Sequence, residues 1–90
     1  MTPDQLVKEL ETLAQKSGIQ VRFEKGDFEG GFCVLKSERI IVVNRKIPAA
    51  RRASVLALGI AEIGVDEVYL KPAVREFIED ELAKSGKSSS

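Results

Sequence analysis

The apolar residues near the start of the chain repeat first at helical spacing and then at strand spacing. The helical stripe comprises Leu6, Leu10, Leu13 and Ala14. Thr2 and Gln5 stand three residues apart, as in a capping box, and Gly18 predicts the end of this helix. Strict alternation over residues 19–24 then predicts a strand that has one polar face.

The next two apolar segments, residues 31–35 and 40–43, do not alternate in this way. The short polar turn at residues 37–39 between them predicts an antiparallel hairpin formed by residues 31–36 and 39–44. Successive side chains of a strand point to opposite faces of its sheet. Both faces of this hairpin therefore carry apolar residues, and we expect both to be buried.

Two further helices are predicted in the second half of the chain. Pro48 begins a helix that is apolar almost all round, and Gly64 marks its end. Inside it, Gly59 costs about 1 kcal/mol relative to alanine, which indicates close packing against a neighbour. Residues 65–71 fit a loop, a turn or a strand, and Pro72 begins the last helix. The apolar stripe of that helix comprises Val74, Phe77, Ile78 and Leu82.

The order helix, three strands, helix, helix predicts a two-layer α+β fold with a three-stranded antiparallel sheet. Its 90 residues suffice for one domain. We expect this domain to span residues 1–84. Residues 85–90 are expected to form a disordered tail, because they contain no apolar side chain.

Helices on one face of such a sheet leave an apolar second face uncovered. Either helices lie on both faces, or a sheet or helix surface contacts another chain, in which case an isologous dimer is the simplest assembly. The predicted contact face comprises Cys33, Leu35, Ile41 and Val43.

Composition and targeting signals narrow the class of protein. Hydrophobic residues make up 43% of the chain and charged residues 31%, which is typical of a globular domain. No apolar run approaches the roughly 18 residues that a membrane span needs. The first residues lack the layout of a secretion signal, and a single cysteine cannot form a disulfide within one chain. We therefore expect a cytoplasmic protein without a membrane partner.

The charge is uneven, although the formal net charge is zero. Residues 36–52 contain six basic residues and one acidic residue, whereas the segments on either side are slightly acidic. This basic segment supports an alternative function, the binding of nucleic acid or another polyanion. The residues expected to make that contact are Arg39, Arg45, Lys46, Arg51 and Arg52.

Catalytic chemistry is restricted by the absence of histidine. Neither a Ser-His nor a Cys-His arrangement can be built, and one cysteine cannot supply a zinc site. The sequence therefore predicts no catalytic residue, no metal and no cofactor. Cys33 is interpreted as a small buried apolar residue, and a reactive thiol beside Arg39 or Arg45 is the alternative. The acidic residues of the last helix, expected to form a solvated face, are Glu76, Glu79, Asp80 and Glu81.

The middle of the chain resembles the scaffold of the ImmA/IrrE type of zinc metallopeptidases. The matching parts are residues 31–35, residues 40–44, Arg51 or Arg52, and the Leu56-Ala57 pair. In that family a His-Glu-x-x-His helix follows the Leu-Ala pair. Here the corresponding stretch reads Leu-Gly-Ile-Ala-Glu, so both metal ligands and the catalytic acid are missing. The resemblance implies a zincin-like scaffold without the enzyme.

The whole chain is also similar to a family of small uncharacterised bacterial proteins. The similarity lies in the Gly-Gly-x-Cys sequence at residues 30–33 and the Tyr-Leu-x-Pro-Ala-Val-Arg sequence at residues 69–75. That family implies no activity. Taken together, the sequence predicts a non-catalytic protein-interaction domain that pairs with itself or with another protein.

Overall fold

The computed structural model describes residues 1–27, 30–35, 38–63 and 70–85, with the backbone alone described at residues 32–35 and 85. The elements are α1 (Pro3–Lys16), β1 (Ile19–Glu24), β2 (Gly30–Leu35), β3 (Glu38–Asn44), α2 (Ala49–Ile63) and α3 (Pro72–Ser85). This order confirms the predicted α+β fold. The predicted helix end at Gly64, residues 65–69 and the tail from residue 86 lie outside the described residues.

The sheet is mixed, with the strand order β1-β3-β2. β2 and β3 form the predicted antiparallel hairpin. β1, however, pairs with β3 in parallel, so the prediction of a purely antiparallel sheet is wrong. The reason is a crossover: after β1 the chain passes the central position and places β2 at the far edge. β3 then returns between them in the direction of β1.

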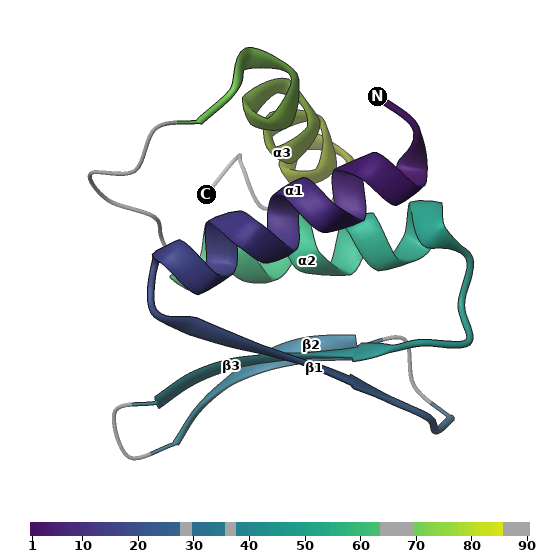
Figure 1. The fold of residues 1–90 in the computed structure, drawn as a ribbon, viewed down its shortest axis with the longest axis vertical. Coiled ribbons are helices and arrows are strands. Elements are labelled where there is room, and N and C mark those ends of the chain that lie inside the picture. The colour runs from purple at the N-terminus through teal and green to yellow at the C-terminus, as the bar shows by residue number, and fades with distance from the viewer. Residues whose placement is uncertain (28–29, 36–37, 64–69, 86–90) are drawn as a thin grey trace.

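All three helices lie on one face of the sheet (Figure 1). α1 contacts β1, and α2 contacts both β2 and β3. α3 packs on the outer side of α1 and α2 and contacts no strand among the described residues. The sheet therefore has one face covered by helices and one face that no described helix covers.

Local sequence signals set the ends of α1. The Thr2 backbone N–H donates to Gln5 Oε1 at 2.9 Å, and the Gln5 N–H donates to Thr2 Oγ1 at 3.2 Å. The predicted capping box is thus confirmed. Gly18 follows the helix with a φ of 77°, a conformation that favours glycine and turns the chain into β1.

The core fills the space between the covered face and the helices. Gly59 of α2 packs closely on β3, because a Cβ built on it would lie 2.9 Å from Cδ1 of Ile41. This contact confirms the close packing expected at Gly59. The largest fully buried side chains are Leu10, Ile19, Ile41, Val43, Leu56 and Ile60.

The Asn44 side chain forms hydrogen bonds to the loop between β1 and β2 and to the backbone that follows β3. Its side chain is only 5% exposed; Nδ2 donates to the Gly26 carbonyl at 2.8 Å, and Oδ1 accepts from the Lys46 N–H at 2.9 Å. The Arg45 N–H also donates to the Glu24 carbonyl at 3.0 Å. The end of β3 is therefore bonded to the loop that passes it, which holds β2 at its edge of the sheet.

Candidate interaction surfaces

The predicted apolar contact face does not form a single surface. Ile41 and Val43 are fully buried in the core beneath the helices, so they are not available to a partner and their prediction as contact residues is wrong. Alternation shows that a strand has two faces but not which one the helices cover. In the backbone register, Cys33 pairs with Ile40 and Leu35 pairs with Glu38.

On the face of the sheet that no described helix covers, the apolar side chains of β3 are only slightly exposed. Ile40 is only 6% exposed and Val42 is half-buried. The neighbouring positions of β1 on this face are exposed and polar, and the Arg22 guanidinium lies 3.3 Å from the Glu24 carboxylate. Among the described side chains, Met1 is the only large apolar one that is exposed. The described part of this face therefore offers little apolar surface to a partner.

The two edge strands differ in charge. β1 carries Arg22 and Glu24, and charges on an edge strand discourage pairing with another chain. β2 contains neither a charged residue nor a proline over its six positions. No described strand pairs with the outer edge of β2, and an edge of this kind presents backbone N–H and C=O groups to a partner strand. An uncharged run at residues 30–35 is visible in the sequence, but its position at an edge is not.

The basic residues divide between the two ends of β3. Arg39 stands at its beginning and donates from Nη2 to the Ser17 carbonyl at 3.2 Å. The other four follow the end of β3, roughly 20 Å away at about 3.3 Å per residue. These four basic residues, the basic cluster, lie close together in the chain around the beginning of α2, and Arg45 and Arg52 among them line one groove. The basic cluster comprises Arg45, Lys46, Arg51 and Arg52.

A groove of about 400 Å³ opens beside this basic cluster, between α1, β1 and the start of α2. Arg52 is half-buried there and donates from Nε to the Ile47 carbonyl at 3.2 Å. The groove combines cations and carboxylates, so its charge is mixed. Its lining comprises Asp4, Val7, Lys8, Glu11, Phe23, Arg45 and Arg52.

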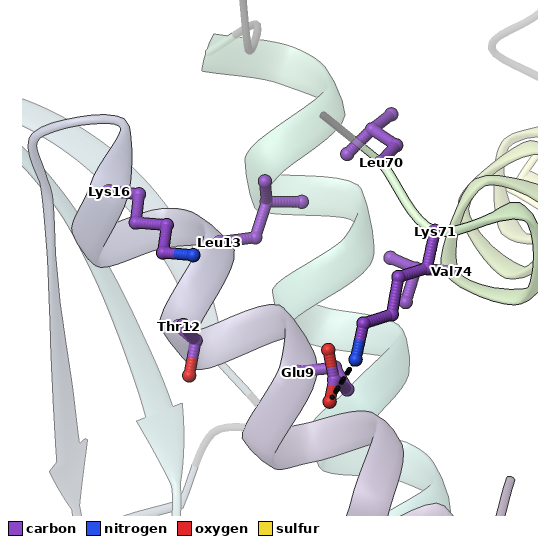
Figure 2. Close-up of a pocket in the computed structure, with 7 residues that line it drawn as sticks. All are labelled: Glu9, Thr12, Leu13, Lys16, Leu70, Lys71 and Val74. Atoms are coloured by element: carbon purple, nitrogen blue, oxygen red, sulfur yellow. Dashed lines mark hydrogen bonds and ion pairs between the residues drawn. The ribbon is translucent and has the colours of Figure 1, made fainter. Parts of the chain in front are cut away.

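A second hollow, between α1 and the start of α3, is too small for most ligands (Figure 2). Its volume is about 90 Å³, against the roughly 300 Å³ or more of a ligand pocket. Lys71 Nζ lies 3.0 Å from Glu9 Oε2 across it. This ion pair joins α1 to the residue that precedes α3.

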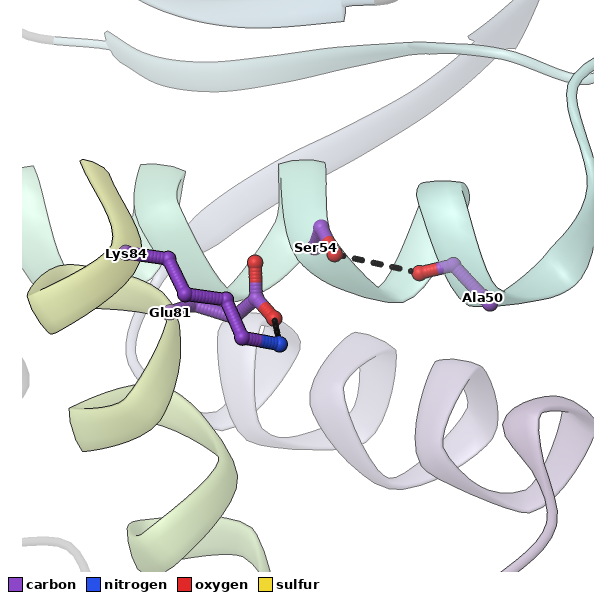
Figure 3. A network of polar contacts seen from close by, with 4 residues as sticks. All are labelled: Ala50, Ser54, Glu81 and Lys84. Atoms are coloured by element: carbon purple, nitrogen blue, oxygen red, sulfur yellow. Dashed lines mark hydrogen bonds and ion pairs between the residues drawn. The ribbon is translucent and has the colours of Figure 1, made fainter.

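Glu81 departs from the predicted solvated acidic face of α3. It is 8% exposed and lies between α3 and α2, with its Oε2 atom 3.4 Å from Lys84 Nζ (Figure 3). Nearby on α2, the Ser54 hydroxyl donates to the Ala50 carbonyl of the same helix at 3.2 Å. The other three acidic residues of that face, Glu76, Glu79 and Asp80, are exposed as predicted.

The described residues contain no group of three or more His, Cys, Asp or Glu side chains that could hold a metal ion. The stretch that corresponds to the metallopeptidase motif lies on α2, where Gly59 and Ile60 are buried. No helix in the described ranges is long and apolar enough to cross a membrane. No family model, curated protein or solved structure matches the chain.

Proposed function

We propose that this chain is a non-catalytic interaction domain that forms a homodimer through the side of the sheet where β2 lies. The observation that carries the proposal is the uncharged edge of β2, which no described strand pairs, in a sheet whose described helices all lie on one face (Figure 1). An edge of this kind is a template for pairing with another strand. A second copy of the chain supplies such a strand in an isologous contact.

Light scattering coupled to size-exclusion chromatography tests the proposal. The mass of the particle should rise from the 9.9 kDa of one chain toward twice that value as the protein concentration increases. A mass that stays at one chain over the whole range, up to about 1 mM, contradicts the proposal.

The cluster of Arg45, Lys46, Arg51 and Arg52 favours polyanion binding as the second candidate function. These residues surround the beginning of α2, whose first turn contains no acidic residue. The positive end of the helix dipole adds to their charge at this position.

Fluorescence anisotropy with a short labelled DNA duplex tests this second function. Four phosphate contacts predict a log–log salt dependence with a slope of about −3 to −4. The variant Arg45→Glu/Lys46→Glu should lose binding, whereas Arg39→Glu, at the other end of β3, should retain most of it. Binding that is absent, or that does not weaken with salt, would exclude this function.

A further inference from the structure

We propose that the dimer forms around a twofold axis beside β2, where the α2 helices of two copies pack antiparallel and the two β2 strands join their sheets. The inference rests on the proposed self-association and identifies the surface that performs it. The helical part of that surface, called the α2 stripe below, comprises Arg51, Val55, Leu58 and Glu62.

The members of the α2 stripe share one face of the helix, because they are four, three and four positions apart. Val55 and Leu58 in the centre are half-buried, and Arg51 and Glu62 at the ends are exposed. Val55 lies against β2, since a Cβ built on Gly30 would come within 2.7 Å of its Cγ1 atom. The stripe therefore lies on the side of the molecule where β2 forms the sheet edge.

α1 and α3 both contact α2, and the fully buried residues of α2 lie at helix positions away from the stripe. This arrangement gives a physical reason for a helix that is apolar almost all round: one part of its surface faces the core, and the centre of the stripe is left for a partner. The fully buried α2 residues are Ala53, Leu56, Ala57 and Ile60.

The α2 stripe is complementary to itself when two copies run antiparallel. A twofold axis between Val55 and Leu58 brings each of these residues to the other one in the second copy. The same rotation brings Arg51 to Glu62 of the second copy, so a cation meets a carboxylate at each end. An apolar centre with charges at the rim is the usual anatomy of a protein interface. This charge pattern identifies a second copy as the occupant.

The spacing of the sheet is compatible with this helix contact. α2 contacts both β2 and β3, so its axis runs approximately over the gap between them. Two paired β2 strands would lie about 4.8 Å apart, which places the two α2 axes about 10 Å from each other. Packed helices have axes about 8 to 10 Å apart. Pairing of the strands and pairing of the helices can therefore occur around one axis.

A twofold axis normal to the sheet also fixes the direction of the strands. The rotation reverses the chain direction of β2 and leaves each face of the sheet on its own side, so the β2 strands pair antiparallel. The product is a continuous six-stranded sheet with all helices on one face. No charge within Gly30–Leu35 opposes this pairing.

Exchange of the two stripe charges tests the inference. Arg51→Glu alone brings two carboxylates together at each end of the interface, and Glu62→Arg alone brings two guanidinium groups together. We expect each single variant to raise the dimer dissociation constant at least about 10-fold. The exchanged chain Arg51→Glu/Glu62→Arg should dimerise like the wild type. An equimolar mixture of the single variants should form a heterodimer, as measured by sedimentation equilibrium.

The controls are charge reversals outside the stripe. Arg45→Glu and Glu79→Arg lie at exposed positions and should leave the dissociation constant unchanged. Circular dichroism of every variant checks that the fold is kept, and recovery in the exchanged chain or in the mixture excludes misfolding as the cause of the loss. A dimeric wild type whose affinity survives both single reversals, or does not recover on exchange, overturns the inference but leaves the proposed function standing. A wild type that is monomeric at all concentrations removes both.

Discussion

On both sides of the molecule a helix lies against an edge strand of the sheet, α1 against β1 and α2 against β2. The two sides differ in the charge of their residues. On the α1/β1 side, the groove above β1 is lined by charged residues of α1, and β1 itself exposes Arg22 and Glu24. On the α2/β2 side, half-buried Val55 lies against a strand without charges, and half-buried Leu58 follows it on the same face of α2. This difference in charge is what the proposed dimer through the α2/β2 side depends on.

Leu58 provides the largest expected difference between the two sides. Leu58→Asp places a carboxylate in the apolar centre of the α2 stripe, where it would lose water on dimerisation. We expect the dissociation constant to rise at least about 100-fold, as at an interface hot spot. Gln15→Asp, at an exposed position of α1, is the control and should have no effect. An unchanged dissociation constant for Leu58→Asp would show that the centre of the stripe stays in water.

Gly30 and Gly31 test the contact between α2 and β2. A Cβ on Gly30 would lie 2.5 Å from the Val42 carbonyl oxygen, and the residue has a φ of 147°. We expect Gly30→Ala to lower the free energy of unfolding by about 2 to 3 kcal/mol, measured by urea denaturation. Gly31 has nothing within 4 Å of a built Cβ, so Gly31→Ala should change stability by less than about 0.5 kcal/mol. Equal effects at the two positions would contradict this account of Gly30.

Asn44 lies between the two sides. Its side chain is hydrogen-bonded to the loop that leads from β1 to β2. Asn44→Ala removes the bond to the Gly26 carbonyl and leaves the Lys46 N–H without its side-chain acceptor. We expect a loss of about 2 kcal/mol in the free energy of unfolding. Asn44→Asp keeps an acceptor for Lys46 but turns a carboxylate oxygen toward the Gly26 carbonyl in a buried site, so it should not recover that loss. An Ala variant as stable as the wild type would mean that the crossover is held by other contacts.

Removal of the charges of β1 should make the two edges alike. The Arg22–Glu24 ion pair is 3.3 Å long between side chains that are 54% and 45% exposed, so it contributes at most about 0.5 kcal/mol to stability. Arg22→Thr/Glu24→Thr should therefore unfold at nearly the same urea concentration. Its two uncharged edges should, however, form particles larger than a dimer in light scattering. A strictly dimeric double variant would show that charge does not protect β1.

Local patterns predicted most of the elements of this fold, because each is encoded by nearby residues. The capping box of Thr2 and Gln5, the β2–β3 hairpin and the close packing at Gly59 all follow from short-range sequence signals. The parallel pairing of β1 with β3 does not, because it depends on which edge the crossover selects.

The interaction surface could be predicted only in part. Periodicity showed that Ile41 and Val43 share a face, but only the packing of α2 shows that this face is covered. Glu81 stands among exposed acidic residues in the sequence, and its burial depends on how α3 lies on α2. The α2 stripe could not be predicted from the sequence for the same reason. In a helix that is apolar almost all round, only tertiary contacts determine which residues remain outside the core.

Hydrogen–deuterium exchange at increasing protein concentration tests the pairing of β2 most directly. Backbone amides that join a second strand are protected from exchange, whereas those of a water-exposed edge are not. If β2 pairs with a second copy, peptides covering Gly30–Leu35 should exchange more slowly as the concentration rises, while those covering Ile19–Glu24 should keep their rates. Concentration-independent exchange in β2, or slowing confined to β1, would contradict this pairing.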